Sequence, residues 1–105
     1  MSTSPKLDLP TLQDRCKRLQ DLLQRYSATE PDAALCLREL KPIFDQAMAG
    51  QISEPRKYGA PCGYYFTEGS LRQYRELENA FAQFSMALQG YSDEYLEALI
   101  AKVRR

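Results

Sequence analysis

Residues 50–70 interrupt a chain whose remaining sequence is patterned as helices. This segment holds four of the five glycines, two of the six prolines and the aromatic run Tyr64-Tyr65-Phe66. Glycine and proline disfavour regular secondary structure, whereas large aromatic side chains gain free energy when they are buried. The sequence therefore predicts helices joined by one long connection, whose aromatic residues pack either on the protein's own core or on a partner.

Before this segment, apolar residues recur at steps of three and four, which is typical of one face of a helix. We expect a first helix over 9–27, with Pro10 in its first turn and residues 1–8 as a frayed leader. Its expected buried face consists of Leu9, Leu12, Cys16, Leu19, Leu22, Leu23 and Tyr26.

A second helix is expected to begin near Thr29 and Pro31 and to end at Gly50, because these residues suit a helix start and a C-terminal cap. Its expected apolar stripe is Ala34, Leu37, Leu40, Phe44 and Met48. Pro42 lies inside this pattern. Because the stripe keeps its phase across the proline, one kinked helix is favoured over two separate helices.

After the long connection, two further helices are expected. The first is capped by Thr67 or Ser70, closes at Gly90, and buries Leu71, Tyr74, Leu77, Phe81, Phe84 and Leu88. The second begins at Ser92 and buries Leu96, Leu99, Ile100 and Val103. No alternating run typical of a strand is present. We therefore expect one all-α domain over 1–105, a small antiparallel bundle of four helices with one long Gly/Pro/aromatic-rich loop between the second and third.

Composition disfavours several classes of partner. The 14 basic and 14 acidic residues cancel, whereas nucleic-acid-binding proteins usually carry an excess of positive charge. No apolar run approaches the roughly 20 residues that span a bilayer, and the N-terminus has no apolar signal core. The three cysteines, Cys16, Cys36 and Cys62, fit a reducing compartment. We expect a cytoplasmic protein that binds neither nucleic acid nor membrane.

The sequence also lacks the usual chemistry of enzymes. It contains no histidine, no CxxC spacing that would suggest a zinc site or a redox pair, and no glycine-rich phosphate loop. Glu68, Glu76 and Glu78 can in principle supply an acid–base pair, but the spacing of Arg72 to Glu76 favours solvated ion pairs. We therefore expect no enzymatic activity, no catalytic, cofactor-binding or metal-binding residue, and no small-molecule substrate.

The long connection and the residues after it hold the candidate partner-binding site. Tyrosine and arginine are over-represented at interface hot spots, and several of each lie close together here. The alternative is that the aromatics cover the open end of the bundle; in extended backbone, Tyr65 would face opposite to Tyr64 and Phe66. The candidate partner-binding residues are Arg56, Tyr58, Tyr64, Tyr65, Phe66, Glu68, Arg72, Gln73 and Glu76.

Two sequence segments resemble a known family. The helix LRELKPIFDQAMAG is followed by a loop and then by YYFTEGSLRQYRELENAF, in which an aromatic-x-Glu start leads into a helix. Over about residues 34–88 this order resembles small all-helical bacterial immunity proteins that neutralise NAD(P)-hydrolysing toxins delivered by type VI secretion. The resemblance implies a protein that binds the catalytic domain of a toxin and blocks access of NAD to its pocket.

Two functions therefore remain open. In the first, the chain is a cytosolic immunity protein, and residues 58–68 with Arg72, Gln73 and Glu76 occlude the active site of its cognate toxin. In the second, it is a small helical adaptor or regulatory subunit whose groove binds a partner helix. A protruding polar-aromatic loop favours the first function, whereas a continuous exposed apolar stripe favours the second.

Overall fold

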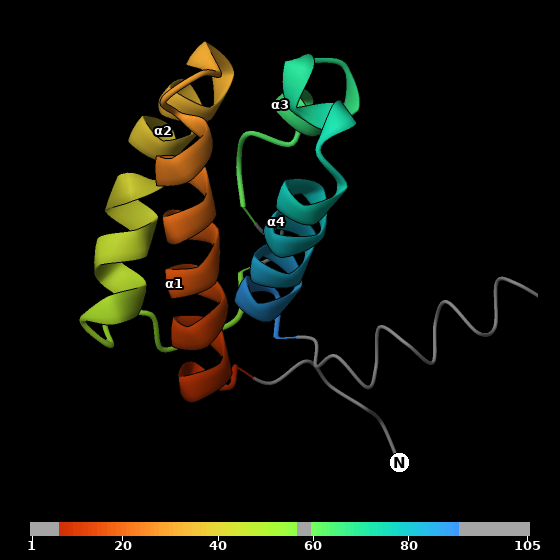
Figure 1. The fold of residues 1–105 in the computed structure, drawn as a ribbon. Coiled ribbons are helices and arrows are strands. Elements are labelled where there is room, and N and C mark those ends of the chain that lie inside the picture. Colours follow the sequence, from red (N-terminus) through yellow and green to blue (C-terminus); the bar gives the residue numbers. More distant parts are fainter. Residues whose placement is uncertain (1–6, 57–59, 91–105) are drawn as a thin grey trace, which may run out of the picture.

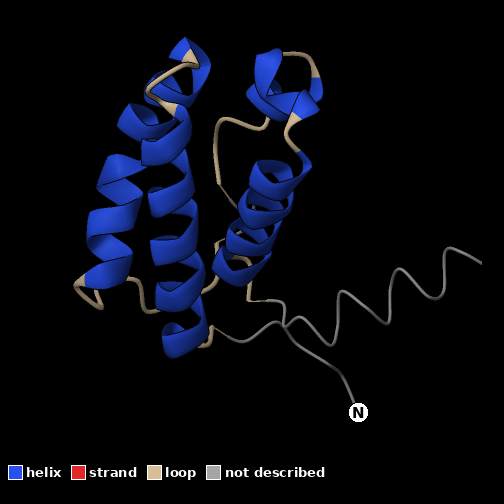
Figure 2. Cartoon of the chain, viewed as in Figure 1, coloured by secondary structure: helices blue, strands red, loops and turns tan. Residues whose placement is uncertain are grey.

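A computed structural model describes residues 7–56 and 60–90 of the chain, and these residues are mostly helical. Along the chain they form α1 (Leu9–Tyr26), α2 (Pro31–Met48), the short α3 (Tyr64–Thr67), the 3-10 helix η1 (Ser70–Gln73) and α4 (Arg75–Leu88). The described residues contain no strand, in agreement with the all-α prediction (Figure 2). The fourth helix predicted from Ser92 lies outside them.

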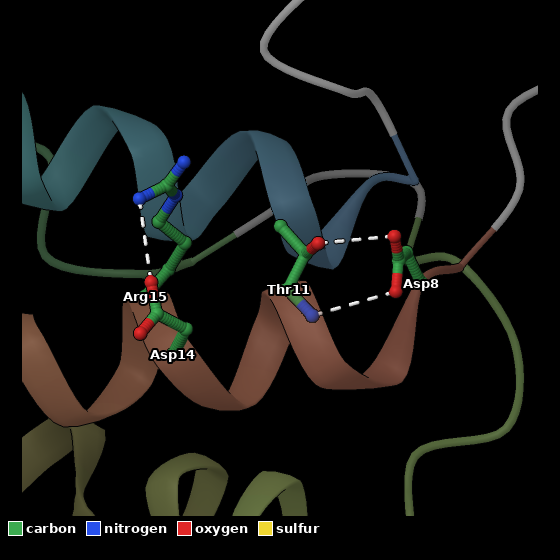
Figure 3. A network of polar contacts seen from close by, with 4 residues as sticks. All are labelled: Asp8, Thr11, Asp14 and Arg15. Carbon is green, nitrogen blue, oxygen red and sulfur yellow. Dashed lines mark hydrogen bonds and ion pairs between the residues drawn. The ribbon is translucent and has the colours of Figure 1, made fainter.

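The first helix begins where an aspartate caps it. One carboxylate oxygen of Asp8 accepts a hydrogen bond from the backbone N–H of Thr11 at 3.4 Å, and the other accepts one from the Thr11 hydroxyl at 3.0 Å (Figure 3). Such a cap stabilises a helix by about 1 kcal/mol. Asp8, predicted to be the last residue of a frayed leader, therefore belongs to the helix start. One turn later, Arg15 forms an ion pair with Asp14 at 3.5 Å.

α1 packs against both of the other long helices. It runs antiparallel to α2 on one side and to α4 on the other (Figure 1). Its observed bounds agree with the predicted helix over 9–27, and the centre of the predicted face is buried. Leu9 and Tyr26, at the two ends of that face, are only half-buried. The buried residues of α1 are Leu12, Cys16, Leu19, Leu22 and Leu23.

α2 turns inward a face that agrees only in part with the one its spacing predicted. Leu40 and Phe44 are buried as expected, but Ala34 and Met48 are exposed. Apolar residues occupy all five positions from 33 to 37, so periodicity alone does not fix the phase of this helix. The helix continues without interruption through Pro42, whose ring is exposed to solvent. The observed buried face is Ala33, Cys36, Leu40, Ile43, Phe44 and Ala47.

α4 begins later than predicted. Tyr74 is in an extended conformation (φ −102°, ψ 91°) and separates α4 from the 3-10 turn, so neither Thr67 nor Ser70 caps this helix. The end is as predicted, because Gly90 adopts a left-handed conformation (φ 85°) that closes the helix. Leu77, Phe84 and Leu88 are buried as expected.

Two aromatic pairs connect the elements of the core. Phe44 of α2 meets Phe84 of α4 edge to face, with ring centroids 5.2 Å apart. Phe66 of α3 stacks on Phe81 of α4 at 4.4 Å. Phe81, predicted to lie mid-core, is only half-buried because it faces α3 at the margin of the core.

The connection after α2 follows the C-terminal half of α4. It leaves α2 at Gly50 in a left-handed conformation (φ 71°). The backbone N–H of Arg56 then donates to the carbonyl of Leu88 at 2.7 Å, and the N–H of Ala60 donates to the hydroxyl of Ser85 at 3.1 Å. These bonds fix the path by which the chain reaches α3.

We expect Phe84→Ala to lower the free energy of unfolding by about 3–5 kcal/mol, because the ring is fully buried against Phe44. Phe81→Ala serves as the matched control and should cost clearly less, since its ring is half-exposed. Urea denaturation followed by circular dichroism measures both. An equal or greater loss for Phe81→Ala would contradict the packing described above.

Candidate partner-binding surface

The structure brings together only part of the predicted partner-binding set. Glu68, Arg72 and Gln73 line one open hollow of about 380 Å³, together with Gly69 and Ser70. Tyr64 lies in α3, which packs directly against η1, and its side chain is 65% exposed. We call residues 64–74 the α3–η1 corner; it lies beyond the N-terminal end of α4 (Figure 1).

Other predicted residues lie elsewhere. The backbone N–H of Arg56 donates to the carbonyl of Leu88, the last residue of α4, whereas the corner lies beyond the first residue of that helix. The length of α4, about 20 Å, therefore separates Arg56 from the corner. Glu76 lines a different hollow, of about 440 Å³, whose other lining residues come from α1. Phe66 is 5% exposed and belongs to the core. Tyr58 lies outside the described residues.

The aromatic run is helical, not extended. Because successive residues of a helix point about 100° apart, its three side chains have three different environments. Tyr64 is exposed, Tyr65 is half-buried and Phe66 is buried. The run is therefore divided: Phe66 belongs to the core, Tyr65 lies at its edge and Tyr64 lies on the surface.

Two acidic residues at the start of α2 anchor the corner, and we call Glu30 and Asp32 the acidic clamp. The Ser70 hydroxyl lies 2.9 Å from a carboxylate oxygen of each, so its single proton is donated to one at a time. The Ser70 N–H also donates to Asp32 at 3.3 Å. The Tyr74 hydroxyl donates to the other oxygen of Glu30 at 2.8 Å.

The clamp also changes the acidity of Tyr74. Its hydrogen bond to Glu30 is the main cause that raises the pKa of the Tyr74 phenol above the usual value, and burial and the negative charge of Glu30 add to it. The phenol therefore remains a hydrogen-bond donor. Its ring also contacts Tyr26 of α1, with centroids 4.7 Å apart. The sequence analysis did not include Glu30 and Asp32 among the candidate site residues and missed this role.

A third carboxylate of α2 holds the other side of the corner. Glu39 accepts a hydrogen bond from the Tyr65 hydroxyl at 3.4 Å and one from the Cys62 thiol at 2.9 Å. Burial, followed by the charge of Glu39 and its hydrogen bond, raises the pKa of Tyr65. Tyr64 is thus flanked by residues that are fixed to α2.

Within the corner, α3 and η1 touch backbone to backbone. A Cβ atom at Gly69 would lie 2.9 Å from both the Cα and the carbonyl oxygen of Tyr65. The Gln73 side-chain amide donates to the Ser70 carbonyl at 2.9 Å, which closes the 3-10 turn. The corner is therefore a pre-organised surface that offers an aromatic ring and groups of both charges.

The described residues contain no group of three or more cysteines, aspartates or glutamates placed to hold a metal ion. Within the same residues, no helix is long and apolar enough to cross a membrane. The chemistry that the corner presents is hydrogen bonding, charge and aromatic contact.

We expect Gly69→Ala to destabilise the protein by about 1–3 kcal/mol, because the new methyl group would overlap the Tyr65 backbone and force η1 away from α3. Gly63→Ala is the matched control: nothing lies within 4 Å of its Cβ position, and its backbone is already helical. Thermal unfolding of both variants measures the difference. Similar melting temperatures would show that the contact between α3 and η1 is not close.

Comparisons of the chain with protein-family models, with curated proteins and with solved structures gave no match.

Proposed function

We propose that this chain binds a protein partner through the α3–η1 corner, and that the partner is the catalytic domain of an NAD(P)-hydrolysing toxin. The chain would act in the cytoplasm as the immunity protein of that toxin, and by occlusion alone, without catalysis or a cofactor. The observation that carries the proposal is Tyr64, a large aromatic residue with 65% of its surface exposed, on a corner that α2 fixes from two sides.

The corner has the composition of an interface centre. Tyrosine is enriched among hot-spot residues because it offers a large area while few side-chain torsions must be fixed on binding. Glu68, Arg72 and Gln73 are exposed beside it and can supply a polar rim that sets specificity and association rate. Because the clamp already orders this surface, little conformational entropy is lost when a partner binds.

The choice of a toxin as partner rests on the resemblance to immunity proteins, which spans residues 34–88 and therefore the whole corner. Occluding an active site requires a surface but no catalytic group. In this proposal the predicted helix from Ser92 completes an antiparallel four-helix bundle, and the exposed side chains of the corner remain accessible to the toxin.

The adaptor function is less well supported by the described residues. Their large exposed aliphatic side chains are Leu35 and Met48, both on α2. At 3.6 residues per turn these two side chains point about 140° apart around the helix axis. They therefore do not form the continuous stripe that a partner helix would need.

The test measures binding of the full chain to the toxin domain encoded beside its gene, together with NAD hydrolysis by that domain. Tyr64→Ala should weaken binding on the order of 30-fold, which corresponds to about 2 kcal/mol for a hot spot. Arg72→Ala should weaken it less. Neither variant should shift the melting temperature by more than about 2 °C, since both side chains are exposed.

Arg56→Ala is the matched control, because Arg56 is exposed at the far end of α4 and should leave binding unchanged. The corner is not the binding surface if Arg56→Ala weakens binding as much as Tyr64→Ala. The immunity function fails if the neighbouring gene encodes no toxin, or if the bound toxin still hydrolyses NAD at its full rate.

A further inference from the structure

Two cysteines that are far apart in sequence face each other in the structure. Cys36 lies on α2, and Cys62 lies in the connection directly before α3. The Cys62 sulfur lies 2.9 Å from a carboxylate oxygen of Glu39 and packs against the buried cluster that contains Cys36, close enough that the Cys36 thiol affects the pKa of Cys62. Because Glu39 is one helical turn from Cys36, both contacts place Cys62 on the same face of α2. Both cysteines are in the free thiol form.

The two thiols differ in their access to solvent. Cys36 is fully buried, whereas Cys62 is half-buried at the edge of the core. Cys62 also has a left-handed backbone (φ 78°), a conformation that is unusual for a residue with a side chain. A reagent in solution can therefore reach Cys62, whose sulfur lies beside Cys36.

We propose that Cys36 and Cys62 form a reversible disulfide by exchange with a low-molecular-weight disulfide such as oxidised glutathione. The Cys62 thiol loses its proton to solvent and attacks one sulfur of glutathione disulfide, whose S–S bond breaks and releases one glutathione thiolate. The Cys36 thiol then gives up its proton and attacks the Cys62 sulfur, which expels the second glutathione. Two protein thiols are oxidised, and one disulfide is reduced to two thiols.

The surroundings of Cys62 set the rate of this reaction. The neighbouring Cys36 thiol is the main cause that raises the pKa of the Cys62 thiol, and burial and the carboxylate of Glu39 add to it. Among the described residues, Tyr65 also lies close enough to Cys62 for the two groups to interact electrostatically. Since the thiolate is the attacking species, exchange should be slow at neutral pH and should accelerate as the pH rises. The pair would then stay reduced until an oxidant accumulates.

The disulfide would change the protein by closing a loop. It would join α2 to the chain immediately before the α3–η1 corner and enclose residues 37–61. Closing such a loop restricts the unfolded chain more than the folded one and therefore raises thermal stability. This inference goes beyond the proposed function and does not depend on the identity of the partner.

The experiment incubates the reduced full chain with oxidised glutathione between pH 7 and pH 9 under native conditions. The reaction is stopped with acid, free thiols are alkylated, and the peptides are identified by mass spectrometry. We expect a peptide pair linked through Cys36 and Cys62, formed faster at higher pH and reversed by dithiothreitol. The melting temperature of the oxidised chain should rise by on the order of 10 °C.

Cys16 is an internal control in the same sample, because it is fully buried on α1 and should be recovered as a free thiol. In Cys36→Ala, the reaction should stop at a lasting glutathione adduct on Cys62. If Cys36→Ala does not fold, Cys62→Ser replaces a half-buried residue and should abolish all uptake of glutathione by the folded chain.

The proposal is overturned if the protein without substitutions keeps a lasting glutathione adduct on Cys62. Such an adduct would show that the Cys36 thiol does not attack the Cys62 sulfur and expel the glutathione. It is equally overturned if the linked product is a disulfide between two chains, or if the folded chain does not react at pH 9 while the urea-unfolded chain does.

Discussion

Burial of one face of α1 is the interaction on which the rest of the structure depends. Four leucines and a cysteine of this helix are almost completely removed from water, between α2 on one side and α4 on the other. Each buried leucine contributes about 1.5–3 kcal/mol. α4 packs on α1, and the chain turns from the α3–η1 corner into α4 at Tyr74, whose backbone is extended.

The corner itself is held by a different kind of interaction. Two of its side chains, Phe66 and Leu71, are buried in the core, while carboxylates of α2 bind Ser70, Tyr74 and Tyr65 by hydrogen bonds. Hydrogen bonds to charged groups are stronger than neutral ones and are directional. They can therefore fix a surface that faces solvent, where apolar packing is not available. The polar anchoring leaves Tyr64 and Arg72 exposed.

Sequence reasoning predicted α1 and the end of α4 because each has one apolar face and a clear terminal signal at Pro10 or Gly90. For α2 it predicted the bounds but only part of the buried face, because apolar residues surround the helix near its start and the face is chosen by packing against α1. It also missed the break at Tyr74, since the apolar spacing continues through that residue. The role of Glu30 and Asp32 was not predictable, because their partners lie about 40 residues away in sequence. The juxtaposition of Cys36 and Cys62 depends on tertiary structure in the same way.

The acidic clamp has a consequence for the order in which the protein folds. Glu30 and Asp32 lie where the α1–α2 hairpin turns, and this hairpin is built from contacts that are local in sequence. Local contacts close small loops at low entropic cost and therefore form early. The acceptors for Ser70 and Tyr74 are thus in place before the second half of the chain arrives. We therefore expect the α1–α2 hairpin to form first and the α3–η1 corner to become ordered last, as α4 docks.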